Sequence, residues 1–118
     1  MNKLITNKEG RQIKDEEKNL IISILELAKS NDRIVSIPEV VYDLEDGGIR
    51  TIKLTNNIER VYGKDILQVN FIDSDKTPVI ITLTIDNKDD LFELEFWKVN
   101  FEKLNKYPKP NEIQIIQD

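Results

Sequence analysis

Two glutamates and the only tryptophan of the chain, Glu93, Glu95 and Trp97, lie two residues apart in a segment typical of a β-strand. Side chains at that spacing project from the same face of a strand, so these three should share one surface. Neighbouring carboxylates can act as a general acid and a general base when their environments separate their pKa values. They can also bind a cationic protein, with the tryptophan as the anchor. The plainer interpretation is a solvated sheet face, where both glutamates pair with lysine or arginine across the strands.

A second group of carboxylates, Asp43, Glu45 and Asp46, precedes Gly47 and Gly48. The two glycines can adopt the positive φ angles of a tight turn, so this group should border a β-hairpin. Carboxylates in that position could hold a cation or contact a basic partner. Aspartate before glycine is also ordinary turn chemistry, which requires no ligand.

Two later turns are rich in aspartate, with Asp73 and Asp75 in the first and residues 86–90 forming the second. They superficially resemble a calcium loop, but they lack the glycine at position six and the bidentate glutamate at position twelve of an EF-hand. Lys88 also lies in the middle of the second turn. We therefore expect polar hairpin turns here and assign no metal ligand.

The amino-acid composition excludes several kinds of chemistry, because the 118 residues include no histidine and no cysteine. Without cysteine there are no disulfides, thiolate nucleophiles or cysteine-based zinc sites. Without histidine the commonest general base is missing, and a Ser-His-Asp or Cys-His arrangement is impossible. Glycine-rich phosphate-binding motifs are absent from the sequence too. We expect no catalytic residues and no cofactor, and an enzyme built on carboxylates is the weaker alternative.

The formal net charge of −5 is concentrated in the middle of the chain. Residues 32–97 contain 14 acidic and 7 basic residues, whereas each flanking part has one basic residue in excess. A nucleic-acid-binding protein normally carries a basic patch, and the sequence contains none, so nucleic acid is not an expected partner. An acidic face instead favours a basic protein partner, whose approach it would accelerate.

The length predicts a single domain over residues 1–118, with loose ends at residues 1–10 and 109–118. The N-terminal segment lacks the apolar core of a secretory signal. No apolar run approaches the roughly 18–20 residues that cross a bilayer, so no membrane partner is expected. These features indicate a cytoplasmic protein, and they leave its oligomeric state open between monomer and homodimer.

One helix is predicted over residues 15–30. Leu20, Ile21 and Ile24 belong to an apolar stripe with helical spacing, and Asp15 is the expected N-cap. The stripe is too broad for a helix that stands alone, so it should pack on a sheet.

After the helix the pattern changes to alternation of β-branched and aromatic residues, which favours strands. Short turns join successive strands, so we expect an antiparallel meander of hairpins. In the last long strand, Phe92, Leu94 and Phe96 should face the core. The expected strands cover residues 40–44, 49–54, 66–73, 78–85 and 91–97, with a short edge strand at 113–116. The fold class is therefore α+β, with one N-terminal helix packed on a roughly five-stranded, mainly antiparallel sheet.

Three segments resemble a family of small uncharacterised bacterial proteins. The family has a terminal LFELDxWKVDF-like segment, similar to residues 91–104, and a DGG turn, similar to residues 45–52. Its helix opens with a segment that is similar to residues 11–17. Glu95 and Asn100 stand where the family has aspartates. The family has no assigned catalytic residues, so the resemblance implies none here.

Small acidic cytoplasmic proteins of this bacterial type are often immunity proteins, which neutralise a toxin delivered by a neighbouring cell. The resemblance therefore implies an inhibitor that binds a basic toxin domain through an acidic sheet face, and the charge distribution is compatible with this role. The candidate partner-binding residues are Glu93, Glu95, Trp97, Asp43, Glu45 and Asp46. The alternative is a domain that binds a small molecule or a cation without catalysis.

Overall fold

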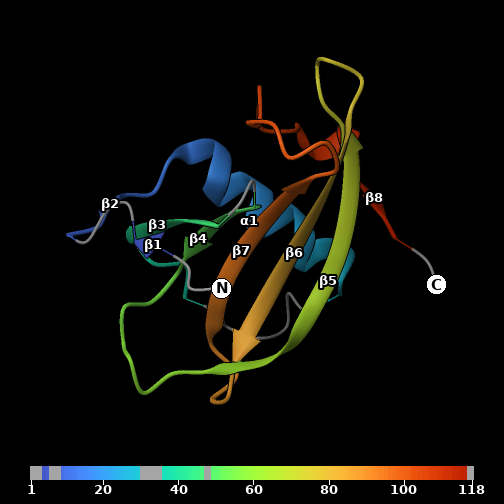
Figure 1. Ribbon diagram of the computed structural model, residues 1–118. Helices are drawn as coiled ribbons and strands as arrows, with labels where there is room; N and C mark the ends of the chain where they lie inside the picture. The colour runs from blue at the N-terminus through green and yellow to red at the C-terminus, as the bar shows by residue number, and fades with distance from the viewer. Residues whose placement is uncertain (1–3, 6–8, 30–35, 47–48, 117–118) are drawn as a thin grey trace.

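One α-helix and an antiparallel sheet form the described part of the chain (Figure 1). The helix, α1 (Asp15–Leu27), lies against one face of the sheet, which confirms the α+β class. Gly47 and Gly48, where the hairpin turn is predicted, lie outside the described residues. The computed structural model describes residues 4–5, 9–29, 36–46 and 49–116.

Helix α1 begins with three carboxylates at residues 15–17, which interact favourably with the positive end of the helix dipole. The N-cap residue is Lys14, so the predicted N-cap at Asp15 is wrong by one position. Glu17 stabilises this start, because its Oε1 accepts a hydrogen bond from the backbone N–H of Lys14 at 2.9 Å. The helix ends at Leu27, earlier than predicted, because the backbone turns left-handed two residues later.

The sheet contains the five long strands and the short edge strand that the sequence predicts, and two further strands of two residues each. These two show no recognisable alternation, so the expected number of roughly five strands is too low. The long strands are β3 (Val40–Asp46), β4 (Ile49–Lys53), β5 (Tyr62–Ile72), β6 (Pro78–Asp86) and β7 (Leu91–Lys98). The short strands are β1 (Leu4–Ile5), β2 (Arg11–Gln12) and β8 (Gln114–Ile115). Neighbours run antiparallel in the order β1-β3-β4-β7-β6-β5-β8, and β2 pairs with β3 beside this path.

Among the five long strands, the order departs from a simple meander at one place. Hairpins join β5 to β6 and β6 to β7, and these strands pair as neighbours. Strand β4 pairs with β7, although residues 54–61 connect it directly to β5. The register aligns Ile52 of β4 with Leu94 of β7, and both side chains are fully buried. The register of this long-range pair thus places buried apolar residues of both strands on the same face of the sheet.

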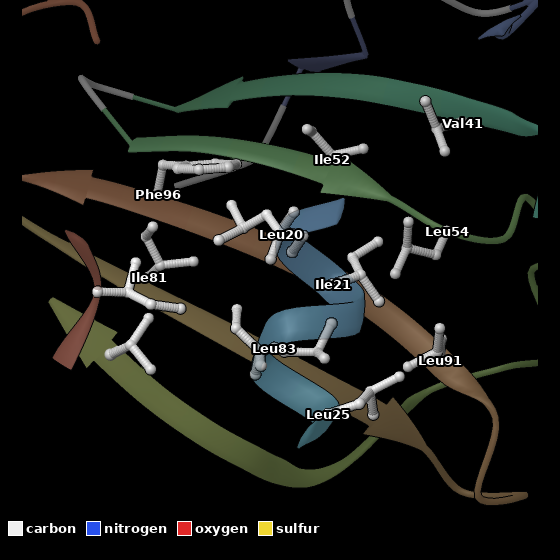
Figure 2. Close-up of a cluster of buried hydrophobic side chains, with 14 of the residues drawn as sticks. Leu20, Ile21, Leu25, Val41, Ile52, Leu54, Ile81, Leu83, Leu91 and Phe96 are labelled. Atoms are coloured by element: carbon white, nitrogen blue, oxygen red, sulfur yellow. The ribbon is translucent and has the colours of Figure 1, made fainter. Parts of the chain in front are cut away.

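The hydrophobic core lies between α1 and one face of the sheet, which we call the helix side (Figure 2). Leu20, Ile21 and Leu25 of α1 point toward strand residues such as Ile52 and Leu83. The predicted apolar stripe of the helix is therefore confirmed as its buried face. Each such side chain contributes roughly 1.5–3 kcal/mol when it is fully buried. The opposite face of the sheet is called the far side below.

A bulge in β7 changes which of its residues face the core. The register between β6 and β7 shifts at Phe92, which has no partner residue in β6. Leu91 consequently joins Leu94 and Phe96 in the core cluster, whereas Phe92 is buried outside that cluster. The expectation that Phe92 shares the core face is therefore wrong, because an extra residue reverses the alternation at this point.

The chain after β7 packs against the helix-side core. Leu104 and Tyr107 contact the core, and Ile113 is buried in it. The 3₁₀-helix η1 (Pro110–Glu112) and β8 follow, and β8 pairs with β5 where residues 113–116 are predicted to form an edge strand. Ile113 thus anchors this part of the C-terminal segment to the core. At the other terminus, β1 pairs with β3.

Candidate functional site

Glu93, Glu95 and Trp97 lie together on the far side of β7, at the centre of the sheet. Glu95 is directly opposite Thr51 of β4 and Thr82 of β6. Residues paired in this way share a face, and the neighbouring rows carry the helix-side core, so the three candidates project away from α1. The prediction that Glu93, Glu95 and Trp97 share one face of a strand is therefore confirmed.

An exposed apolar surface surrounds Trp97. The indole is 37% exposed and lies 6.4 Å, between ring centroids, from Phe101, which is 57% exposed. Ile80 is the direct cross-strand neighbour of Trp97 on β6. One row further along, Val99 donates its backbone N–H to Pro78, whose partner on β5 is Ile72. We call Ile72, Ile80, Trp97, Val99 and Phe101 the Trp97 patch.

Two of the three candidates of the predicted hairpin, Asp43 and Glu45, do not join Glu93 and Glu95. Asp43 and Glu45 are opposite Ile52 and Arg50 of β4, which places both carboxylates on the helix side. Asp46 is the last residue of β3, and its side chain lies outside the described part. Asp43 and Glu45 are therefore separated by the sheet itself from the far-side glutamates, and the six candidates do not form one acidic face.

Asp43 instead belongs to a polar cluster at the N-terminal end of α1. Arg11 Nε and Nη2 donate to the two carboxylate oxygens of Asp43 at 2.6 and 2.9 Å. The same guanidinium donates to both oxygens of Glu17, at 2.9 and 2.8 Å, and Glu17 is 0% exposed. The Tyr107 hydroxyl donates to Glu17 Oε2 at 2.5 Å. With Arg50, which stacks over the Tyr107 ring, these residues form what we call the Arg11 cluster.

The Arg11 cluster holds both of its carboxylates in the ionised form. Burial alone would raise the pKa of Glu17, but hydrogen bonds from Arg11, Tyr107 and a backbone N–H outweigh it and lower the pKa. The bidentate hydrogen bonds from Arg11 lower the pKa of Asp43. Burial and the bond to Glu17 raise the pKa of the Tyr107 phenol, which keeps it a neutral donor. The cluster is charge-balanced and joins β2, α1, β3 and the C-terminal segment.

The two aspartate-rich turns are occupied by cations of the chain itself. Lys98 Nζ lies 3.0 Å from Asp73 and 2.7 Å from Asp75, and its third donor reaches the carbonyl of Lys103 at 3.1 Å. In the next turn, Arg60 Nη1 lies 2.7 Å from a carboxylate oxygen of Asp86 and of Asp90. Lysine and arginine thus stand where a bound cation would be needed. Among the residues with described positions, no group of acidic side chains is arranged to hold a metal ion.

These ionised carboxylates should make stability depend on pH. Burial would raise the pKa of Asp73 and of Asp86, but backbone N–H donors and the adjacent cation lower it in each case. With Glu17 and Asp43 they keep a folded-state pKa below the unfolded values of about 3.9 to 4.3. Their stabilisation is therefore complete above about pH 5 and is lost as the pH falls through the folded-state pKa. Thermal melts followed by circular dichroism should show a constant midpoint from neutral pH to about pH 5 and a steep fall below about pH 4. A midpoint that stays level through the acid range would contradict the assignment.

A pocket of about 250 Å³ lies on the helix side, between the sheet and the segment that follows β7. Sequence reasoning missed it, because residues 101–104 form one wall without regular secondary structure. The apolar character of Phe101 and Leu104 is the signal that this segment packs on something. The lining residues are Glu45, Ile49, Arg50, Phe96, Lys98, Phe101, Glu102, Lys103 and Leu104.

A comparison with protein families finds one match, a family model described as a domain of unknown function (DUF6984), over residues 10–108. That range begins just before Arg11 and ends just after Tyr107, so it contains the whole Arg11 cluster. No curated protein and no solved structure matches the chain. In the described part, no helix combines the length and the apolarity that crossing a membrane requires.

Proposed function

The chain belongs to the family described as a domain of unknown function (DUF6984), and from that starting point we propose that it binds a basic protein through the Trp97 patch and the adjoining glutamates. The observation that carries the proposal is the exposure of the patch. Trp97 and Phe101 touch each other at the surface, and Ile72, 57% exposed, extends the apolar area across β6 to β5. Contiguous exposed apolar area next to polar groups is typical of a protein-binding site.

The chemistry of the patch suits a hot spot. Tryptophan is among the residues that contribute most to binding when a partner removes them from water. Trp97 is positioned by a central strand with neighbours on both sides, so it needs little ordering when a partner binds. The tilted contact with Phe101 restricts the indole further.

Glu93 and Glu95 supply the acidic part of the surface. They precede Trp97 on the same face of β7, where Lys53 lies directly opposite Glu93. Charged groups beside an apolar anchor speed the approach of an oppositely charged partner and set its orientation. Asp43 and Glu45 have no part in this surface, because they lie on the helix side.

More specifically, we propose that the chain is an immunity-type inhibitor that acts in the cytoplasm. The basic partner would be a toxin domain, and the far side of the sheet would cover the toxin's active site or a surface beside it. The acidic net charge of −5 and the exposed patch together support the proposal of an inhibitor. Inhibition by occlusion requires no catalytic residue in the inhibitor.

Replacing Trp97 by alanine should weaken binding of the purified toxin domain, encoded beside the chain's own gene, by about tenfold or more. The indole would no longer be buried in the interface. Tyr62→Ala is the matched control, because Tyr62 is an aromatic residue exposed at the opposite end of β5. Affinities are measured by titration calorimetry, with circular dichroism to show that each variant is folded. Equal affinity of the wild type and Trp97→Ala would remove the patch from the proposal.

Charge variants distinguish the electrostatic contribution to binding from the contact made by Trp97. The double variant Glu93→Lys with Glu95→Lys should slow association most strongly at low salt, because screening removes long-range attraction. Glu26→Lys with Glu59→Lys changes the net charge equally at exposed positions away from the patch. A dimer of the wild type that Trp97→Ala converts to a monomer would instead assign the patch to self-association and overturn the proposal.

A further inference from the structure

The helix-side pocket has apolar walls and one arginine with open donors. Phe96 lines it from the sheet, and Phe101 and Leu104 line it from the segment that follows β7. Arg50 is part of the same lining, and its side chain is 31% exposed. A concave apolar site with a single convergent polar group is the usual form of a small-molecule site.

Arg50 keeps donors that can bind a ligand, because the carboxylates nearest to it already accept hydrogen bonds from Arg11. The nearest carboxylate oxygens to Arg50 Nη2 belong to Asp43, at 3.5 Å, and Glu17, at 3.8 Å. Both carboxylates already accept short, bidentate bonds from Arg11. The guanidinium of Arg50 therefore makes only long contacts with these two carboxylates, at 3.5 and 3.8 Å, and within the described part of the chain no shorter bond engages its five N–H donors.

The position of this guanidinium is restricted by an aromatic ring. Its central carbon lies 5.6 Å from the ring centroid of Tyr107, in a cation–π contact. The Tyr107 ring packs in turn on Phe96, with 5.5 Å between the ring centroids. A guanidinium is planar and can present two parallel N–H donors, which match the two oxygens of a carboxylate.

The remaining charges of the pocket select a ligand with a single negative charge. Lys98 lines the pocket, but its ammonium is consumed by Asp73 and Asp75. Lys103 is exposed, and Glu45 and Glu102 are exposed carboxylates on the same walls. Two acidic side chains against one exposed lysine disfavour a phosphate or a dicarboxylate, which would add a second negative charge.

We propose that this pocket binds a small monocarboxylate with an apolar body, whose carboxylate pairs with Arg50 and whose body lies between Phe96 and Leu104. The volume of about 250 Å³ suits a molecule of a few carbon atoms or a single ring. Phe101 belongs to both the pocket wall and the Trp97 patch, and its backbone has a φ of +62°, which costs about 1 kcal/mol in a residue other than glycine. Ile49, which also lines the pocket, is the direct cross-strand neighbour of Trp97. Arg50 and Phe96 lie on the opposite face from the patch, and the proposed site does not depend on the proposed protein partner.

The test is an NMR titration of the full chain with hexanoate, in which the amide signals of residues 101–104 and the Nε–H of Arg50 are followed. Hexanoate should shift these signals with saturation, whereas hexanol, hexylamine and inorganic phosphate should not. Because these four probes are compared on the wild type, the result does not depend on whether a variant folds. Shifts produced equally by hexanol would mean that the pocket recognises apolar bulk alone, which would overturn the assignment of Arg50.

The matched variant is Arg50→Gln, which should weaken hexanoate binding by about tenfold, because a charge-assisted pair is lost. Lys103→Gln removes a charge from the same wall without touching the proposed contact and should leave the affinity within about twofold. Saturable hexanoate binding that Arg50→Gln leaves unchanged would overturn the proposal, as would the absence of any shift at millimolar hexanoate.

Discussion

Replacing Glu17 by glutamine should lower the free energy of unfolding by about 3 kcal/mol. Glu17 is fully buried, and its two oxygens accept bonds from Arg11, Tyr107 and the backbone N–H of Lys14. A glutamine of the same shape presents an NH₂ group to one of these donors, and it leaves the charge of Arg11 with Asp43 alone. Removing one partner from a buried charge pair is more costly than the net value of the pair itself.

The measurement is denaturant unfolding with linear extrapolation to water. Glu16→Gln is the matched control, because it makes the same chemical change one residue earlier on an exposed position of α1. It should change stability by no more than about 0.5 kcal/mol. A double-mutant cycle of Glu17→Gln with Tyr107→Phe should be non-additive, because the two side chains share a hydrogen bond. Additive effects, or a Glu17→Gln variant as stable as Glu16→Gln, would show that the cluster contributes little.

Replacing Asp73 by alanine should lower the free energy of unfolding by about 2 kcal/mol and release the segment after β7. The buried carboxylate accepts bonds from the backbone N–H of Ser74 and of Asn105, at 2.7 and 2.8 Å, and from Lys98. Asp73 thus ties the turn between β5 and β6 to the segment that forms one wall of the pocket. Without it, the Asn105 N–H loses its acceptor.

Hydrogen exchange measures the local part of this prediction. The Asn105 amide should exchange faster in Asp73→Ala than the global loss of stability explains, because the C-terminal segment opens separately. Asp75→Ala is the control, since Asp75 pairs with the same Lys98 but is partly exposed and does not bond to Asn105. It should produce a smaller loss of stability and leave the exchange of Asn105 unchanged. Protection of Asn105 that survives in Asp73→Ala would contradict the proposed role of Asp73.

Much of the sheet could be predicted because its long strands alternate over five or more residues. The segments at β4, β6 and β7 were found nearly to their ends for this reason. Of the two-residue strands only β8 is predicted, as the edge strand at 113–116, and β1 and β2 are missed because so short a run carries no period. The β4–β7 pair was not found either, since nothing local in the sequence distinguishes it from a β4–β5 neighbour. The bulge at Phe92 was missed for a related reason, because one inserted residue is visible only against the partner strand.

For the candidate site, the spacing of residues in the sequence predicts which side chains of one strand share a face. It does not predict which side chains of two different strands share a face. Glu93, Glu95 and Trp97 share a face because alternation is a property of β7 alone. Asp43 lies on the other face because the register with β4 decides which set of β3 residues is turned inward. The cluster around Arg11 also depends on contacts up to 90 residues apart, as between Glu17 and Tyr107. Such contacts leave no periodic signal in the sequence.

The pairing of β4 with β7 has a consequence for the nascent chain on the ribosome. The β3–β4 hairpin emerges first, but the partner that covers its second edge follows about 40 residues later, a delay of several seconds at ordinary rates of synthesis. During that time Arg50 and Lys53 are the charges that keep the waiting edge from pairing with another chain. The bond between Glu17 and Tyr107 likewise has to wait, because Tyr107 is made 90 residues after Glu17. The last contacts of this domain therefore form long after its helix has been made.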